Sequence, residues 1–581
     1  MKQDCVRADD FIADKRHAVR GLREAVRCAV KTGCLCVCLG RGTYILDEYE
    51  TIETNSIAHD DGCGDIREKD CFLFLSGIQG LTIRGTCTKD GEPATVLAGL
   101  HEQDPQILMP AILWAESCSS LKLENIAVTR IPETASAGVV KRVSKDEVEV
   151  EVFPDLPCED GMVPYCMNRF DTGGNDRGNR KECRLMGESL TYGFGYDRRF
   201  IKTGERTMCL PDAKIAGKVK VGEGLSWHQS GRTDFQLFFG GCDGLSLSNV
   251  RIYNTNGFAI LTENCRNITA RRLVIKPAGD QFFTGPRDGW KIYRCGGAIL
   301  LDRCHVEGVR MDGQNVHSNF LIVERRIGRR ELICTCKYAP VPLRLPSAIG
   351  IYDGISMSEF QLESWEFAGG FKERSVQPEE KTAGAAVAGT VNQITRYRLV
   401  VKEDLPDSAA AGSLVHALCW EPDSYECRDS VFKNIAGAGH LLRCRNVTIR
   451  GCRYENLMNA GILIGAEFST HCEGGHGENI TIQDCSFINC GFKPRYDSYG
   501  MGGIAVKSQG FSGPYNRNII ISACRFEACR QGIELCDAGQ VVMSDLCFVD
   551  VQQPLRIEGK TTEKVEADNI LDSSQIEVKY L

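Results

Sequence analysis

Three related stretches decide the fold: RNVTIRGCRYENL at 445–457, ENITIQDCSFINC at 478–490 and RNIIISACRFEAC at 517–529. Each opens with a polar turn, alternates apolar and polar residues, turns again, and ends in a second short alternating run. Alternation with a period of two is typical of β-strands with one buried face. Because one such unit cannot bury its own apolar side chains, neighbouring units must stack on it to form a core.

The same pattern recurs along most of the chain, at spacings of about 22 to 40 residues. Its other occurrences are QGLTIRG at 79–85, SSLKLEN at 119–125, DGLSLSN at 243–249, RNITARR at 266–272, GGAILLD at 296–302 and GQVVMSD at 539–545. We therefore predict an all-β fold, a right-handed parallel β-helix. A large β-sandwich is the alternative, but sandwich strands should show fewer matched units.

Two long gaps interrupt the repeat. The first contains the hairpin-like run GVVKRVSKDEVEVEVFPDL, and the second contains FLIVERRIGRRELICTCKY. We predict that each gap holds a small β-barrel inserted into the solenoid. The expected domains are an N-terminal cap with the first coils (1–135), the first insert (136–235), central coils with the functional site (236–318), the second insert (319–428) and the C-terminal coils (429–581).

The N-terminal segment predicts a helix over 9–32, because its apolar residues fall on one stripe at spacings of three and four. Asp9 or Asp10 is the expected cap, and Gly33 is the expected end. Such a helix would cover the first coil, whose sheet edge would otherwise be open.

Composition excludes several classes of protein. The net charge of −8, without a long Lys/Arg run, argues against general nucleic-acid binding. No apolar run is long enough to span a membrane, and the first residues do not form a signal peptide. The 30 cysteines are scattered mostly singly, which fits reduced, buried thiols. We therefore expect a cytoplasmic protein, or an extracellular one if a signal has been removed.

The candidate site lies in RDGWKIYRCGGAILLDRCHVEGVRMDGQNVHSNF at 287–320. Asp288 and Asp312 are 24 residues apart, which would return them to the same wall one coil apart. Two facing carboxyl groups suit glycoside hydrolysis, in which one protonates the leaving oxygen and the other activates water or attacks. Asn315 and His317 follow at alternating positions, so we expect both on one face as hydrogen-bonding partners.

A second cluster, GILIGAEFSTHCEGGHGENITIQ, contains Glu467, His471 and Glu473. Its spacing matches no standard zinc motif, so we predict no metal and no cofactor. Instead we expect Glu473 to be a further catalytic carboxylate, and Glu467 and His471 to bind substrate. Trp290 is a candidate for stacking on a sugar ring, because its indole combines a large apolar face with a polar edge.

The segment 282–320 resembles glycoside hydrolase family 110, the inverting α-1,3-galactosidases, in its CxG…EG…NVH pattern. The later segment ILIGAEFSTHCEGGHGENITIQDCSFINCGF is also similar, with Glu473 on a family glutamate. By this resemblance Asp288, Asp312, Asn315 and His317 occupy family site positions. At position 311 the family has an Asp where this chain has Met311. The chain also departs from the family pattern at Ser318, Phe320, His471 and Cys472.

The resemblance implies metal-independent exo-hydrolysis that removes a terminal α-linked galactose-type sugar with inversion. Asp288 and Asp312 would share the acid and base roles, in an order that the sequence leaves unassigned. Met311 motivates an alternative, a carbohydrate-binding β-helix protein with altered catalysis. A β-helix polysaccharide lyase or epimerase is a further alternative, although no dense Asp ladder for Ca²⁺ is evident. The expected partner is a carbohydrate substrate, with no nucleic acid or membrane, and a homodimer is allowed.

Overall fold

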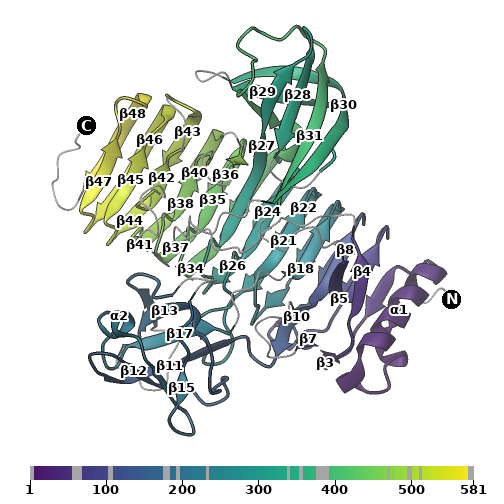
Figure 1. Cartoon of the computed structure of the whole chain (residues 1–581), viewed down its shortest axis with the longest axis vertical. Coiled ribbons are helices and arrows are strands. Elements are labelled where there is room, and N and C mark those ends of the chain that lie inside the picture. Colours follow the sequence, from purple (N-terminus) through teal and green to yellow (C-terminus); the bar gives the residue numbers. More distant parts are fainter. Residues whose placement is uncertain are drawn as a thin grey trace.

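The chain winds into a three-sided parallel β-helix from which two other bodies project (Figure 1). This confirms the predicted fold class. The computed structural model describes residues 5–54, 68–101, 109–173, 183–191, 196–229, 235–336, 341–352, 357–374, 391–467, 472–475, 477–493, 500–508 and 513–572.

Two sides of the solenoid belong to one 23-stranded sheet, whose strands pair in parallel from coil to coil. The first side consists of β2 (Cys36–Cys38), β6 (Thr82–Arg84), β9 (Lys122–Glu124), β19 (Asp243–Ser248), β22 (Arg266–Arg271), β25 (Gly296–Asp302), β33 (Ser424–Arg428), β36 (Val447–Arg450), β40 (Glu478–Gln483), β43 (Asn516–Ser522), β46 (Ala538–Val549) and β48 (Glu563–Asp572), with β1 (Val6–Arg7) paired to β2. The second side consists of β3 (Gly42–Leu46), β7 (Thr95–Leu100), β10 (Ile126–Ile131), β20 (Arg251–Ile252), β23 (Val274–Ile275), β26 (His305–Glu307), β34 (Val431–Ile435), β37 (Arg453–Leu457), β41 (Ser486–Cys490) and β44 (Arg525–Glu527), with the end of β46.

The third side carries the candidate site and is called the third ladder below. Its strands are β5 (Glu68–Ser76), β8 (Ala111–Glu116), β18 (Phe235–Gly240), β21 (Phe258–Glu263), β24 (Trp290–Tyr293), the start of β27 (Gln314–Arg326), β35 (His440–Leu442), β38 (Ile462–Ile464), β42 (Ile504–Val506), β45 (Gln531–Leu535) and β47 (Gln553–Ile557). In addition, β4 (Glu50–Glu53) pairs antiparallel with β5.

Stacked rows of identical or similar side chains fill the interior. Tyr454, Phe487 and Phe526 lie on successive coils with ring centroids 4.9 Å apart, which matches the spacing of neighbouring strands. Cysteines occupy the turns in similar rows, such as Cys118, Cys242, Cys265 and Cys295, all buried. The described cysteines are all free, and most are buried as small apolar side chains.

The helix that covers the first coil is shorter than predicted. Two 3-10 turns (Ala8–Asp10 and Lys15–His17) precede α1 (Val19–Thr32), which ends at Gly33 in the left-handed conformation with φ of 69°. Asp9 is not the cap, because its carboxylate accepts a hydrogen bond from the Tyr44 hydroxyl and pairs with Lys15. In the part of the chain that the structure describes, no helix is sufficiently long and apolar to cross a membrane.

The first insert is a seven-stranded antiparallel sheet with its own apolar core. Its order is β14-β13-β17-β11-β12-β16-β15 with no pairing between the two end strands, so among the described residues it is an open sheet, and the prediction of a β-barrel for this insert is wrong. The elements are β11 (Ala135–Val143), β12 (Val148–Val152), β13 (Tyr165–Asp171), β14 (Arg184–Met186), β15 (Ile201–Lys202), β16 (Thr207–Leu210), α2 (Ala213–Ala216) and β17 (Gly224–His228).

The second insert is a closed antiparallel barrel. Its strands pair in the cycle β27–β28–β31–β30–β29–β32–β27. Strand β27 is shared: Gln314–Val316 pair with the third ladder, and Phe320–Ile322 pair with the barrel. The other elements are β28 (Glu331–Cys336), β29 (Ser347–Tyr352), β30 (Met357–Arg374), β31 (Val391–Val401), β32 (Leu414–Ala417) and a 3-10 turn (Leu418–Trp420).

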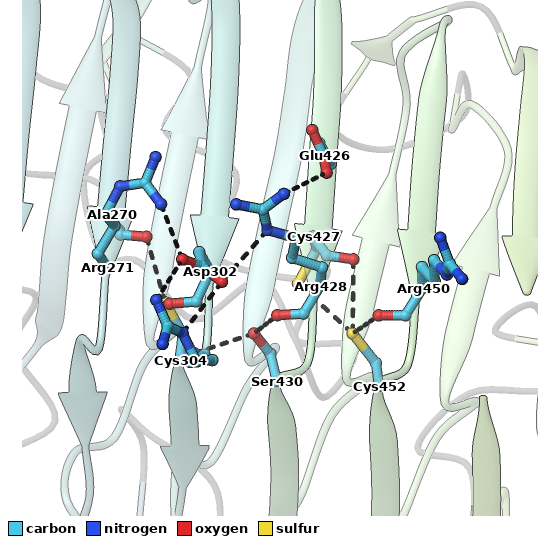
Figure 2. A network of polar contacts seen from close by, with 11 residues as sticks. Ala270, Arg271, Asp302, Cys304, Glu426, Cys427, Arg428, Ser430, Arg450 and Cys452 are labelled. Atoms are coloured by element: carbon cyan, nitrogen blue, oxygen red, sulfur yellow. Dashed lines mark hydrogen bonds and ion pairs between the residues drawn. The ribbon is translucent and has the colours of Figure 1, made fainter. Parts of the chain in front are cut away.

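The outer face of the first side carries a row of charges (Figure 2). Arg271, Asp302, Arg428 and Arg450 occupy successive coils in register. The Asp302 carboxylate pairs with Arg271 at 2.8 Å, with Arg303 at 3.0 Å and with Arg428 at 3.2 Å. These guanidinium groups neutralise one carboxylate between three strands and so tie neighbouring coils together.

Candidate active site

Strands β24 and β27 are neighbours in the third ladder, with Trp290 opposite Gln314 and Tyr293 opposite His317. The predicted 24-residue coil is therefore present, and Asp288 and Asp312 stand at equivalent positions just before the two strands. The backbone N–H of Asp312 donates to Asp288 Oδ1 at 3.1 Å. The turn that starts each coil thus brings the two acidic residues together.

The two carboxyl groups have different surroundings. Asp288 is 3% exposed, and its Oδ2 accepts a hydrogen bond from Asn315 Nδ2 at 3.3 Å. Asp312 is 8% exposed, and its Oδ1 accepts from the backbone N–H of Ala438 at 2.8 Å. Burial, reinforced by the negative charge of Asp288, raises the pKa of Asp312 to about 7. At pH 7 Asp312 is therefore roughly half protonated, beside the negative charge of Asp288.

Space for Asp312 depends on Gly437 in the next coil. A Cβ at this position would lie 2.5 Å from the carbonyl of Met311 and 2.7 Å from Asp312 Oδ1. Any side chain at 437 would therefore displace the carboxyl group. The small residues of AGAGH at 436–440 are explained by this close approach of one turn to the next.

Asn315 and His317 project from the outer face of β27, because Val316 between them is buried in the solenoid core. The His317 ring is 5.0 Å from the Tyr293 ring, and its Nε2 lies 3.7 Å from Glu473 Oε1. Both residues thus lie on one face of β27, and Asn315 is the one whose side chain is hydrogen-bonded to Asp288.

Glu473 belongs to β39 (Glu473–Gly474), a short strand that pairs antiparallel with β27 at Ser318 and Asn319. Its carboxylate forms a buried ion pair with Arg443, which also donates to the carbonyl of Gly465 at 3.0 Å. The positive charge of Arg443 also acts to lower the pKa of Asp312. Arg443 therefore connects the Glu473 segment electrostatically with the acidic pair.

Glu467 lies beside Glu473, since its backbone N–H donates to the Glu473 carbonyl at 3.0 Å. Its side chain is 4% exposed, so it is part of the same buried polar region. His471, which we predicted to bind substrate, lies outside the described residues.

Trp290 is a correction to the sequence prediction. Its side chain is fully buried in the solenoid core, where its Nε1 donates to Thr262 Oγ1 at 3.2 Å. It stands in register with Gln314, next to Asn315. Successive residues of a strand face opposite sides, so Trp290 cannot share the outer face with Asn315. It packs the interior and does not reach a sugar.

Sequence reasoning missed Lys291 and Arg443. Lys291 is opposite Asn315, is 4% exposed, and its positive charge acts to lower the pKa of Asp312. The 24-residue step from Asn315 would have identified it. Arg443 follows β35 (His440–Leu442), one coil after His317. No spacing within one continuous stretch could find Arg443, because the second insert separates the two coils.

Arg310 anchors the turn that precedes Asp312 to the first insert. The Arg310 guanidinium donates to His228 Nδ1 at 2.9 Å, to Asn168 Oδ1 at 2.7 Å and to Ser226 Oγ at 3.3 Å. All three partners come from the insert, on β13 and β17. Burial lowers the pKa of Arg310 to about 9. Because Arg310 precedes Met311 and Asp312 directly, the insert fixes the approach to the acidic pair.

Within the described residues, no group of three or more His, Cys, Asp or Glu side chains is placed to hold a metal ion.

Comparisons with known proteins agree with this architecture. A family profile described as "Right handed beta helix region" matches residues 411–570. The α-1,3-galactosidase A of Bacteroides fragilis is 23% identical over 521 residues, which cover 85% of this chain and 78% of that enzyme. The chain is thus similar to this α-1,3-galactosidase along most of its length. Its likeness to the α-1,3-galactosidase B of Phocaeicola vulgatus is 25% identity over 254 residues, covering 42% of this chain and 39% of that enzyme.

These galactosidase relatives confirm the resemblance inferred from 282–320 and from the Glu473 segment. Among solved structures, the A-module of a mannuronan C-5 epimerase from Azotobacter vinelandii aligns with a TM-score of 0.40 and 9% identity over 96% of this chain and 99% of that one. An exopolygalacturonase from Thermotoga maritima aligns with a TM-score of 0.40 and 11% identity over 97% and 91%.

Proposed function

We propose that this protein is an exo-acting glycoside hydrolase that removes a terminal α-linked, galactose-type sugar. The observation that carries the proposal is the stacked pair Asp288 and Asp312, buried on adjacent coils and joined by a hydrogen bond. Its distant relatives are named as α-1,3-galactosidases, and one aligns over most of both chains. The pair lies in the segment 282–320, and the resemblance of that segment to glycoside hydrolase family 110 supports the proposal.

The pair supplies the two functions that glycoside hydrolysis requires. Below about pH 7 it retains the proton that must reach the leaving oxygen. Once that proton has left, the remaining carboxylate charge can activate water or stabilise the positively charged transition state. Asn315 orients the Asp288 carboxylate by its hydrogen bond, and burial excludes bulk water that would otherwise weaken these interactions.

Inversion is the expected stereochemical outcome, and it constrains the site. Inverting enzymes hold their two carboxyl groups roughly 6.5–9.5 Å apart to leave room for water. Adjacent coils are only about 4.8 Å apart along the strand-pairing direction. We therefore assign Glu473, held by Arg443 beside His317, as the further carboxylate that helps to place the water.

The direct test is a screen of aryl α- and β-glycosides with the wild-type chain, followed by Asp288→Asn and Asp312→Asn. Each substitution should lower turnover by about three orders of magnitude or more, because each removes a group that acts in the transition state. Glu534→Gln is a matched control, since Glu534 is 1% exposed on the same ladder in β45. Proton NMR of the first-formed anomer distinguishes inversion from retention. Unchanged rates in both Asp variants would refute the proposal.

One observation favours a second candidate, a carbohydrate-binding protein without hydrolytic activity. At the position where the resembling family has an additional Asp, this chain has Met311, whose Sδ accepts a contact from Arg287 Nη1 at 3.4 Å. If the chain binds galactosides in calorimetry but releases no sugar at high protein concentration, this second function is correct. Met311→Asp should then increase hydrolysis from that baseline.

A further inference from the structure

The third ladder holds another buried carboxyl group, that of Glu263 at the end of β21. Glu263 is in register with Tyr293 on the next coil, and Tyr293 is in register with His317 on the coil after that. Ile260, three residues before Glu263, and Ile292, one residue before Tyr293, are buried in the solenoid core. Glu263 and His317 therefore share the outer face, roughly 10 Å apart across two coil steps.

The surroundings of Glu263 leave part of its carboxyl group unused. Its side chain is 3% exposed, and its Oε2 has no hydrogen-bond partner among the described residues. Burial raises the pKa of Glu263 to about 8, although the charge of Arg294 opposes this effect. At neutral pH the group is thus an uncharged carboxylic acid, which can both donate and accept a hydrogen bond.

A buried oxygen without a hydrogen-bond partner destabilises the folded protein unless a ligand or water supplies the missing hydrogen bond. A buried polar atom without a partner destabilises a protein by about 1–3 kcal/mol, and in native structures such an atom calls for an explanation, such as a catalytic role or a bound water or ion. Lys291 on β24 links this position electrostatically with the acidic pair, because its positive charge acts to lower the pKa of both Glu263 and Asp312. The Lys291 ammonium group is 5.4 Å from the Phe258 ring and 5.9 Å from the Tyr293 ring.

We propose that Glu263 contacts the substrate and sets its specificity, by exchanging hydrogen bonds with hydroxyl groups of an uncharged sugar ring. This inference rests on the hydrolase function proposed above and adds a recognition residue one coil before Asp288. A neutral carboxyl group offers no charge to balance an anionic sugar, so a neutral glycosyl unit is its matching ligand. A hydroxyl pair of defined configuration suits a group that both donates and accepts.

The test compares wild type, Glu263→Leu and the near-isosteric Glu263→Gln on an aryl α-galactoside and its monodeoxy analogues. Wild type should lose roughly 10- to 100-fold in kcat/KM on the analogue that lacks the contacted hydroxyl. Glu263→Leu should lose a similar factor on the parent sugar and should no longer distinguish that analogue. Because the substitution removes an unsatisfied buried oxygen, its urea midpoint should equal or exceed that of wild type.

Three outcomes would overturn the inference: unchanged kcat/KM in Glu263→Leu, an equal loss on every analogue, or a lower urea midpoint for both Glu263 variants. Glu534→Gln is the control for replacing a buried carboxylate elsewhere on the ladder. A wild-type chain that hydrolyses no glycoside would instead refute the hydrolase proposal. In that case, wild type and Glu263→Leu are each titrated with methyl α-D-galactopyranoside in a calorimeter. Equal affinities of the two proteins would show that Glu263 does not contact the sugar.

Discussion

The replacement Asp312→Asn should abolish activity and yet stabilise the protein at neutral and alkaline pH. Asparagine keeps an oxygen for the Ala438 N–H but carries no charge. In the wild type, burial and the neighbouring Asp288 raise the pKa of Asp312 from its ordinary 3.8 to about 7. The folded state therefore binds this proton more tightly than the unfolded state does.

The sign and size of the effect follow from that shift. The stabilising contribution of the proton is fully present below about pH 4 and is lost as pH rises through about 7. The shift corresponds to about 4 kcal/mol as an order of magnitude. Asp312→Asn avoids this loss, so its stability should match wild type near pH 4 and exceed it increasingly up to pH 8.

Urea denaturation followed by circular dichroism, at several pH values from 4 to 8, measures the difference. Asp302→Asn is a control with the opposite sign, because hydrogen bonds from Arg303 and Arg428 lower the pKa of Asp302. Its carboxylate stabilises the fold above about pH 4, so its replacement should be destabilising at neutral pH. A stability difference between Asp312→Asn and wild type that is negative at pH 8, or independent of pH, would refute the reasoning.

Other consequences can be tested in the same preparations. Gly437→Ala should lower turnover by about 100-fold, because the added Cβ displaces Asp312. The control is Gly461→Ala, whose Cβ would meet the Gly503 carbonyl at 2.6 Å and should lower stability without that loss of turnover. Equal turnover in the two variants would contradict this prediction. Arg443→Met should destabilise the fold by about 3–5 kcal/mol by leaving the Glu473 carboxylate buried without its ion-pair partner, as urea denaturation would show. The pH–rate profile should fall as pH rises through about 7, about tenfold per unit, and a flat profile to pH 9 would exclude the shared proton from the mechanism.

The sequence contained the coil but not the partners that come from distant segments. Alternation and the 24-residue step placed Asp288, Asp312, Asn315 and His317 on one wall, because both are local properties of the repeat. The same register argues against Trp290, since a residue opposite Gln314 must face inward when Asn315 faces outward.

Arg443 and the support of Arg310 were not predictable in this way. Arg443 lies one coil after His317 in space, but the second insert separates it from His317 and the acidic pair in the chain. Arg310 meets His228 from the first insert, 82 residues earlier in the chain. Such neighbours depend on where the inserts interrupt the solenoid and on how they dock against it, which no local sequence pattern records.

The position of the acidic pair within the stack of coils determines how readily the backbone around it opens. Each coil contacts mainly its two neighbours, so opening begins at the ends of a solenoid and proceeds inward. Strands β24 and β27 lie in the middle of the third ladder, with several coils on either side. Backbone amides near Asp288 and Asp312 should therefore exchange with solvent far more slowly than those of β2 or β47. The acidic pair therefore lies in the part of the solenoid that is expected to open last.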